Sequence, residues 1–380
     1  MAKRVSLPLP IDVSVERCGQ IFLPDYQALM LQAEQYARGN GIAPAHTDKF
    51  KVAIYDIDQQ NDFCVAEDPR IGYKGSLYVI GAEKSTSRAS EQFLRNLQWI
   101  TTYRKSKDTH WRSQIFFPYH IIAVQDFRDP IFQHDYRRGD HPLPYTNIQT
   151  EEVEFGGGAA ANWKWGVNPA MSGAIQVKMA GQDDYAPVNI RALQRHFAHY
   201  NSELKAKGRY ALTVWPYHCM AEGIGSALVS VTSEVDAFWG FCRGGRQLVD
   251  HKGGHYLTEN YSVYRQEVLT TVGNVPIAQR NTIALEMLRA HDAVLIRGQA
   301  KSHCVAWSID DMLADILDPQ MGDPTLAKKV WIVTDCMDPV IVPGVVDYTP
   351  QANEAIERFK AAGMNVITSD VPFPDFLPVK

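Results

Sequence analysis

The sequence predicts an α/β protein: a three-layer αβα sandwich built around a mainly parallel sheet of about six strands. Two observations carry this prediction. Short apolar runs of strand length alternate with amphipathic stretches of helical length along most of the chain. The 380 residues, 45% hydrophobic and 21% charged, also have the composition of a packed globular protein. Alternating strands and helices give a sheet that is covered on both faces.

The strand candidates are seven apolar runs, and seven allows for false ones in a sheet of about six strands. They cover residues 51–58, 119–126, 209–214, 247–251, 293–297, 329–334 and 365–369. The helix candidates between them cover residues 85–105, 226–242, 281–291, 305–317 and 349–362. We expect these helices to cover the two faces of the sheet.

Two segments interrupt the alternation. Residues 1–48 precede the first strand and form an N-terminal extension to a domain over residues 49–380. Residues 129–208, which contain the tract GGGAAA and the pair Trp163 and Trp165, form an insertion in that domain. Long segments of this kind are often lids or oligomer contacts, and a plain surface excursion is the open alternative.

Charge and apolar runs exclude several function classes. The formal net charge of −5 gives no basic footprint for nucleic acid. No apolar run reaches the roughly 18–20 residues that span a bilayer, and the first residues lack the apolar core of a signal peptide. We therefore expect a cytoplasmic protein with no membrane partner. The six cysteines are scattered without CxxC pairs, so neither a zinc ribbon nor a disulfide framework is indicated.

Three strand ends carry reactive side chains. Asp58 follows the first strand, where a carboxylate can act as general acid and base. Cys304 follows the strand at 293–297 and a Gly/Ala turn, at the start of a helix whose dipole is expected to lower the pKa of the thiol. Lys252 follows the strand at 247–251 and can hold a carboxylate. Singly, these residues are ordinary caps, core cysteines or surface charges, but together they meet at one sheet edge.

Four motifs, in this order, resemble the nicotinamidase branch of the isochorismatase-like cysteine hydrolases. They are Asp58-x-Gln-Asn-Asp-Phe, Trp215-Pro-Tyr-His218-Cys, Lys252-Gly-Gly and Ala300-Lys-Ser-His-Cys304-Val. The resemblance implies a catalytic triad of Asp58, Lys252 and Cys304. It also implies an oxyanion hole from the N–H groups of Ala300 and Cys304, beside a cis peptide at Gln299–Ala300. Phe63, Trp215 and Tyr261 match positions that bind a flat aromatic substrate.

The implied reaction is hydrolysis of a C–N amide bond in a small planar substrate. Asp58 takes the thiol proton, the thiolate of Cys304 attacks the carbonyl, and a thioester forms before water releases the acid. The alternatives are an amidase for a carboxylate-bearing or ureide substrate without metal, and an isochorismatase-type hydrolase. A non-catalytic α/β binding module is a further alternative, although no phosphate-binding loop follows the first strand.

The family's metal site is expected to be incomplete here. The resemblance implies an Asp-x-His pair after the second strand, joined by His218. With the second strand placed at residues 119–126, Asp126 matches, but Arg128 stands where histidine is expected, and arginine cannot coordinate. His134 or His141 could substitute. We therefore expect no tightly bound cofactor, with a divalent metal such as zinc left open, and Arg128 as a residue that binds substrate.

The family also implies a partner beyond the substrate. Its members are often homo-oligomers, so we expect a second copy of the chain as the protein partner and a small-molecule amide as the ligand.

Overall fold

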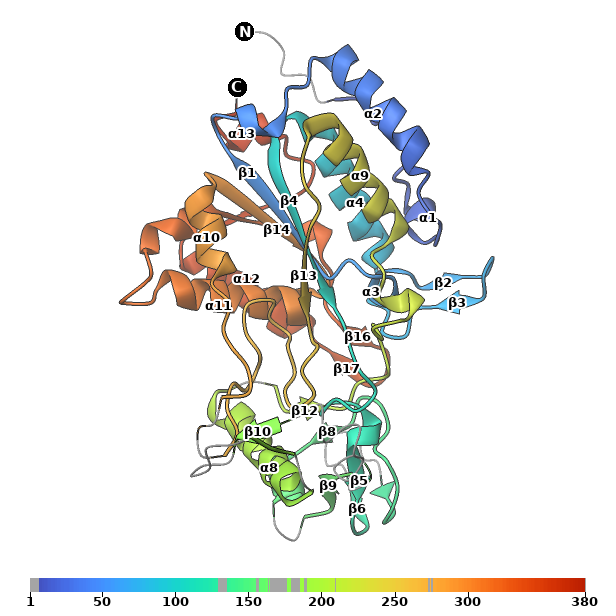
Figure 1. The fold of residues 1–380 in the computed structure, drawn as a ribbon, viewed down its shortest axis with the longest axis vertical. Helices are drawn as coiled ribbons and strands as arrows, with labels where there is room; N and C mark the ends of the chain where they lie inside the picture. Colours follow the sequence, from blue (N-terminus) through green and yellow to red (C-terminus); the bar gives the residue numbers. More distant parts are fainter. Residues whose placement is uncertain are drawn as a thin grey trace.

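The central sheet consists of six parallel strands in the order β13-β4-β1-β14-β15-β18 (Figure 1). Their bounds are β1 Val52–Ile57, β4 Ile100–Asp108, β13 Leu248–Lys252, β14 Ala293–Gly298, β15 Val330–Val333 and β18 Asn365–Ile367. The computed structural model describes residues 7–128, 135–154, 157–162, 164, 176–178, 185–187, 190–208, 210–272, 274 and 276–379. The predicted sheet of about six strands is confirmed, and every strand pair in it is parallel.

Two layers of helices cover the sheet because strand β1 is apolar on both faces. Val52 and Ile54 face a core shared with α1, α2, α4 and α9, and Ala53 and Tyr55 face a core shared with α10, α11 and α12. The helices are α1 Val15–Cys18, α2 Tyr26–Asn40, α4 Ala82–Arg95, α9 Ser230–Arg243, α10 Ile283–Ala290, α11 Ala306–Ile316 and α12 Thr349–Ala361. Alternating side chains thus build two separate cores, which confirms the three-layer sandwich.

Strand β4 is where the sequence-based prediction is wrong. The predicted helix over residues 85–105 ends at Arg95 in α4, and residues 100–108 form a central strand. The strand reads ITTYRKSKD and lacks an alternation of apolar and polar residues. It can still lie in the centre of the sheet, because its buried polar side chains bond to polar partners. Lys105 Nζ lies 2.6 Å from Asp236 Oδ1, and Tyr103 Oη donates to Asp56 Oδ2 at 2.6 Å.

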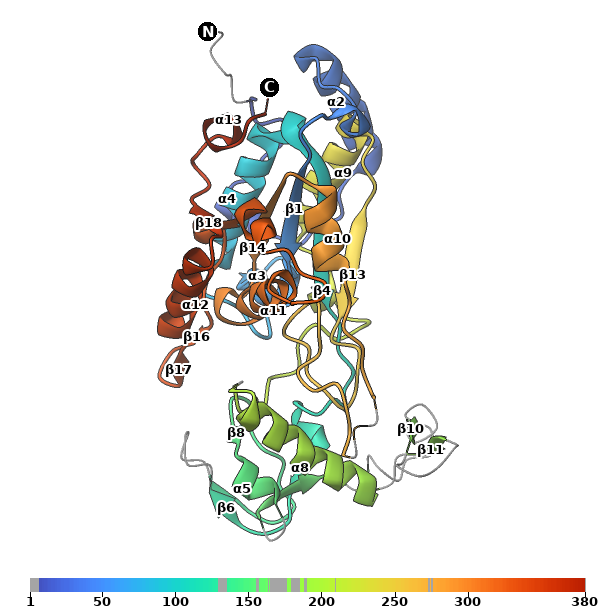
Figure 2. The ribbon, with the colours of Figure 1, turned by 90° about the vertical axis from the view of Figure 1, so that its left-hand side faces the viewer.

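The predicted strands at 119–126 and 209–214 are therefore not in the central sheet. They contain β5, which pairs with β9, and β12, which pairs with β8. Both belong to a long excursion that leaves the end of β4 and returns at His218, so it begins earlier and ends later than the predicted insertion at 129–208. Figure 2 shows this excursion beyond the carboxyl ends of the central strands.

In its described residues, the excursion contains short strands and the two α-helices α5 and α8. They are β5 Ile121–Ala123, β6 Phe127–Arg128, β7 Asp135–Tyr136, β8 Asn147–Ile148, α5 Thr150–Val153, β9 Ala159–Ala161, β10 Gln176–Lys178, β11 Tyr185–Pro187, α8 Ile190–Ala206 and β12 Leu212–Thr213. Its anchors lie at the same sheet edge as the candidate site. Trp163 and Trp165 fall outside the described residues.

The N-terminal extension is part of the helical layer. Helix α2 packs along α9, and Arg17 at the end of α1 forms an ion pair with Glu234 of α9. The smaller elements are α3 Asn61–Cys64, α13 Phe373–Phe376 and the hairpins β2 Glu67–Asp68 with β3 Tyr73–Lys74 and β16 Ile341–Val342 with β17 Val346–Asp347. All six cysteines are buried free thiols. Among the described residues, no helix has the length and apolarity to cross a membrane.

Candidate active site

Asp58, Lys252 and Cys304 come together from three strand ends. Asp58 follows β1, Lys252 is the last residue of β13, and Cys304 lies in the π-helical turn Lys301–Val305 that follows β14. Lys252 Nζ lies 3.0 Å from Asp58 Oδ2 and 3.5 Å from Cys304 Sγ. The sheet therefore brings the three predicted catalytic side chains into contact, although they lie far apart in the sequence.

Asp58 is fully buried and fixed by its neighbours. Its backbone has a φ of 45°, an unusual value for a residue other than glycine, and its N–H donates to Ser106 Oγ at 3.1 Å. The Ser106 hydroxyl in turn donates to Asp58 Oδ1 at 2.6 Å. Burial raises the pKa of Asp58, although Lys252 acts to lower it. A buried carboxylate with a raised pKa is suited to carry a proton during a reaction.

Lys252 remains charged because two carboxylates surround it. Burial alone would lower its pKa, but Asp108 and Asp58 outweigh burial, and the pKa lies well above the usual value. Its Nζ lies 3.1 Å from Asp108 Oδ1 and donates to the carbonyl of Asn260 at 2.9 Å. The following residue, Gly253, has a φ of 79°, and a Cβ there would come within 2.3 Å of Asp108 Oδ1. Glycine after the lysine therefore makes room for this carboxylate.

Cys304 does not have the lowered pKa expected from a helix N-terminus. Burial raises the pKa of the thiol well above its usual value, even though Lys252 acts to lower it. The expectation was wrong because the thiol is 7% exposed and shares its surroundings with two carboxylates, Asp58 and Asp108. The resting thiol is therefore protonated, and nucleophilic attack requires that its proton move to a base such as Asp58.

The turn before Cys304 has the geometry implied by the family resemblance. The peptide bond between Gln299 and Ala300 is cis. The N–H of Ala300 donates to no group in the part of the chain that the structure describes. It is therefore available to a ligand atom at the pocket floor, as an oxyanion-hole donor must be.

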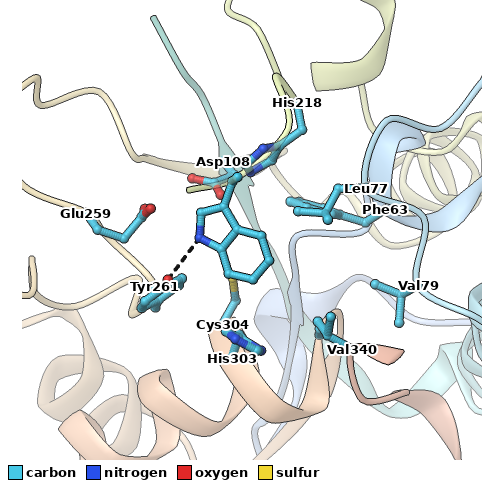
Figure 3. Close-up of a pocket in the computed structure, with 12 residues that line it drawn as sticks. Phe63, Leu77, Val79, Asp108, His218, Glu259, Tyr261, His303, Cys304 and Val340 are labelled. Carbon is cyan, nitrogen blue, oxygen red and sulfur yellow. Dashed lines mark hydrogen bonds between the residues drawn. The ribbon is translucent and has the colours of Figure 1, made fainter. Parts of the chain in front are cut away.

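A small pocket opens above Cys304. Its walls are mostly apolar, with a few polar groups (Figure 3). The lining residues are Phe63, Leu77, Val79, Asp108, Trp215, His218, Glu259, Tyr261, Ala300, His303, Cys304 and Val340. Phe63, Trp215 and Tyr261, expected to contact substrate, all lie in this wall.

A second cluster beside the triad has the donor set of a metal site. One ligand atom each from Asp108, His110 and His218 lies within 4.8 Å of the others. Asp108 and His110 come from the end of β4, and His218 follows the return of the excursion. Three ligands that leave a coordination position open are characteristic of catalytic zinc sites.

The histidines are oriented as metal ligands would be. The Nδ1 atom of His110 lies 3.2 Å from the carbonyl of Gly253, and that of His218 lies 2.7 Å from the carbonyl of Pro216. Each Nε2 is thus left for the cluster, which is the arrangement that second-shell carbonyls impose at metal sites. Burial lowers the pKa of His218 to about 4, so this imidazole is neutral and able to coordinate. These residues fit a divalent metal.

Asp58, Asp108 and Cys304 form another group with metal-ligand spacing. The ammonium group of Lys252 contacts all three side chains and supplies the positive charge there. A metal ion is therefore not needed to balance this second group.

The structure does not place Asp126, predicted as a metal ligand, or Arg128, predicted to bind substrate, at the site. Both lie in the excursion, exposed to solvent, and neither lines the pocket. Arg128 forms an exposed ion pair with Asp135 at 3.7 Å. His141 Nδ1 contacts the carbonyl of Ile121 and is not in the metal cluster, and His134 falls outside the described residues.

The error follows from the missed strand β4. With the second strand expected at 119–126, the predicted aspartate of the Asp-x-His pair is Asp126, which lies eighteen residues after Asp108 in the sequence. The pair Asp108-Thr-His110 was visible in the sequence as the Asp-x-His spacing itself. Sequence analysis also missed Glu259 and His303 in the pocket wall, for which only their nearness to Lys252 and Cys304 gave a signal.

Comparison with known proteins gives structural likeness without sequence likeness. No family model and no curated protein matches the chain. A yeast nicotinamidase bound to the inhibitor nicotinaldehyde aligns over 83% of this chain and 99% of its own, with 17% identity and a TM-score of 0.47. A nicotinamidase from Acinetobacter baumanii aligns over 85% and 98%, with 14% identity and a TM-score of 0.43.

An N-carbamoylsarcosine amidase from Thermoplasma acidophilum aligns over 85% of this chain and 98% of its own, with 13% identity and a TM-score of 0.36. At such identities and TM-scores, the function has to be argued from the site itself.

Proposed function

We propose that this protein is a cysteine-nucleophile hydrolase that cleaves the C–N amide bond of a small planar substrate. The observation that carries the proposal is the contact of Lys252 with both Asp58 and Cys304, beside a pocket that Cys304 lines. A thiol, a carboxylate and a buried cation in contact form a nucleophile, a base and an orienting group.

The proposed reaction proceeds by two acyl displacements, and Asp58 carries a proton in each. Asp58 takes the proton from the thiol, and Cys304 Sγ attacks the amide carbon. The N–H groups of Ala300 and Cys304 hold the negative oxygen that develops. Asp58 then gives its proton to the departing nitrogen as the C–N bond breaks, which leaves a thioester. Asp58 then takes a proton from water, whose oxygen attacks the thioester. As the C–S bond breaks, Asp58 returns this proton to the sulfur, which releases the acid and restores the thiol.

The raised pKa of Asp58 supports this proton path. Burial raises this pKa, so a proton moves from the thiol to Asp58 less uphill than it would to an exposed carboxylate, whereas the raised pKa of the Cys304 thiol opposes the transfer. Lys252 stays charged through the cycle and stabilises whichever partner is anionic.

The pocket walls support a flat substrate. Phe63 and Trp215 present aromatic surface, and Leu77, Val79 and Val340 complete an apolar wall. We also propose that Asp108, His110 and His218 hold a divalent metal such as zinc. When bound, that metal would act as a Lewis acid toward an electron-pair donor of the substrate.

An ammonia-release screen over small amides, with nicotinamide as reference, tests the proposal. The variant Cys304→Ala should lose turnover by about three orders of magnitude or more while the fold is kept, since little volume is removed. The matched control is Cys242→Ala, because Cys242 is a buried thiol on α9 that does not line the pocket. Near-normal ammonia release by Cys304→Ala would remove this cysteine from the mechanism.

Mass spectrometry gives a second and independent readout. The wild-type enzyme with a slowly hydrolysed substrate should carry an acyl adduct on Cys304, and the Cys304→Ala variant should carry none.

A further inference from the structure

Glu259 and Tyr261 are two polar residues of the pocket wall that belong neither to the proposed triad nor to the proposed metal site. They lie two residues apart in the loop after β13, and Figure 3 shows both side chains in the pocket wall. Glu259 is only 4% exposed, and the proposed reaction gives it no task. A buried polar group without a partner is costly, so such groups in a pocket indicate the polarity of its ligand.

Tyr261 is set to donate a hydrogen bond. Its Oη accepts the indole N–H of Trp215 at 3.0 Å, and that indole group can only donate. The tyrosine's own O–H finds no acceptor among the residues that the structure describes. It is therefore free to donate to a carbonyl or ring nitrogen of a bound molecule.

Glu259 is placed to accept a hydrogen bond. Its Oε1 accepts the backbone N–H of Asn260 at 2.9 Å, whereas Oε2 has no hydrogen bond within the described part of the chain. Its backbone is fixed on both sides: the N–H donates to Tyr200 Oη at 3.3 Å, and the carbonyl accepts from the N–H of Glu267 at 2.9 Å. Tyr200 belongs to α8, so the excursion holds this carboxyl group at the pocket.

On the basis of the proposed function, we propose that Glu259 and Tyr261 determine specificity by binding a second polar edge of the substrate. Tyr261 donates to a C=O group and Glu259 accepts from an adjacent N–H group. The favoured substrate is then a planar amide that also carries a lactam or ureide edge. A purely hydrocarbon ring leaves both protein groups unpaired and binds less tightly.

Binding to the Cys304→Ala variant tests the proposal without turnover. The two ligands are benzamide and a pyridone carboxamide whose ring N–H and C=O groups lie side by side opposite the carboxamide. By calorimetry, the pyridone should bind at least about tenfold more tightly than benzamide. Adding Glu259→Leu should remove most of that preference. Adding Glu267→Gln, a buried glutamate on the same loop outside the pocket wall, should leave it unchanged.

The proposal is overturned if the pyridone has no advantage, or if Glu259→Leu weakens both ligands by the same factor. If Glu259→Leu does not fold, Tyr261→Phe replaces it, since this substitution removes only the hydroxyl group. The measured quantity is again the ratio of the affinities for the pyridone and for benzamide. This test is separate from the test of the proposed function. If the wild-type protein releases no ammonia from any amide, the proposed hydrolase activity is wrong. The ratio of the two affinities would still report on Glu259 and Tyr261.

Discussion

The carboxyl ends of β1 and β4 each place a buried carboxylate on Lys252, yet the two groups are tuned in opposite directions. Burial raises the pKa of Asp58. Burial also acts to raise that of Asp108, but His110 and Lys252 outweigh it, and the pKa of Asp108 falls below its usual value. The second partner accounts for the contrast: Asp58 has the neutral hydroxyl of Ser106, whereas Asp108 has an imidazole at 2.9 Å.

This contrast divides the site into two halves that share one lysine. The carboxylate at the end of β1 can gain and lose a proton, so it suits acid and base work. The carboxylate at the end of β4 stays an anion, so it suits the binding of a cation. Substitutions in the two halves should therefore affect turnover and metal content separately.

The substitution Asp58→Asn should have the largest effect, a loss of about three orders of magnitude or more in kcat/KM. Asparagine has the same shape but can neither accept the thiol proton nor return it to the leaving group. Ammonia release measures the loss, and elemental analysis should show unchanged metal content. If Asp58→Asn lost metal instead of turnover, the two halves would have been assigned the wrong way round.

Strands β4 and β1 are held by different interactions, and Asp236→Ala should show that the ion pair of β4 contributes more to the free energy of unfolding than one apolar contact of β1. The substitution leaves the ammonium group of Lys105 buried in β4 without its carboxylate, which typically costs about 3–5 kcal/mol. In β1, by contrast, Ile54→Val removes one buried methyl group and should cost about 0.5–1.5 kcal/mol. Urea unfolding measures both free energies. Similar values for the two variants would mean that the β4 ion pair is not what holds that strand.

At the β4 half, His110→Ala should lower zinc content at least about tenfold, because two protein ligands are too few for a tight site. His141→Ala is the matched control, since His141 contacts a backbone carbonyl in the excursion. Elemental analysis after dialysis gives the metal content. Equal zinc in His110→Ala and wild type would place the ion elsewhere.

The pH profile sharpens the role of Asp58. The base must be ionised, so kcat/KM should fall about tenfold per pH unit as the pH drops below the raised pKa of Asp58. This acid limb should lie above the value of about 3.9 for a solvated aspartate. In Ser106→Ala, the lost hydroxyl no longer lowers the pKa of Asp58, so the limb should move to higher pH. An unmoved limb would assign the titration to another group.

The sequence was sufficient to predict five of the six central strands because those strands are apolar or end in recognisable turns. The residues Asp58, Lys252 and Cys304 could be named because each follows such a strand. Strand β4 could not be recognised, because the partners of its buried polar side chains are brought near only by the fold. Lys105 forms an ion pair and Tyr103 donates a hydrogen bond to a carboxylate. Pattern analysis counts a buried, paired lysine as a surface residue.

One missed strand was therefore enough to misplace the metal site. The positions of Glu259 and His303 in the pocket wall were likewise beyond sequence analysis, because loop residues follow no apolar periodicity. Their side-chain directions depend on contacts with distant segments, such as that of Tyr200 with the Glu259 backbone.

The smallest effect is expected at Arg128, where the sequence alone had suggested substrate binding. Its side chain is 63% exposed, and its ion pair with Asp135 is of the exposed kind that contributes about 0–1 kcal/mol. Asp126, its expected partner at the metal site, accepts instead from the backbone N–H of Arg138. Arg128→His should therefore gain no zinc by elemental analysis and keep kcat/KM within about twofold. A variant that gained metal would show that Asp126 and His218 can share an ion, and the metal half of the site would have to be moved from the end of β4 into the excursion.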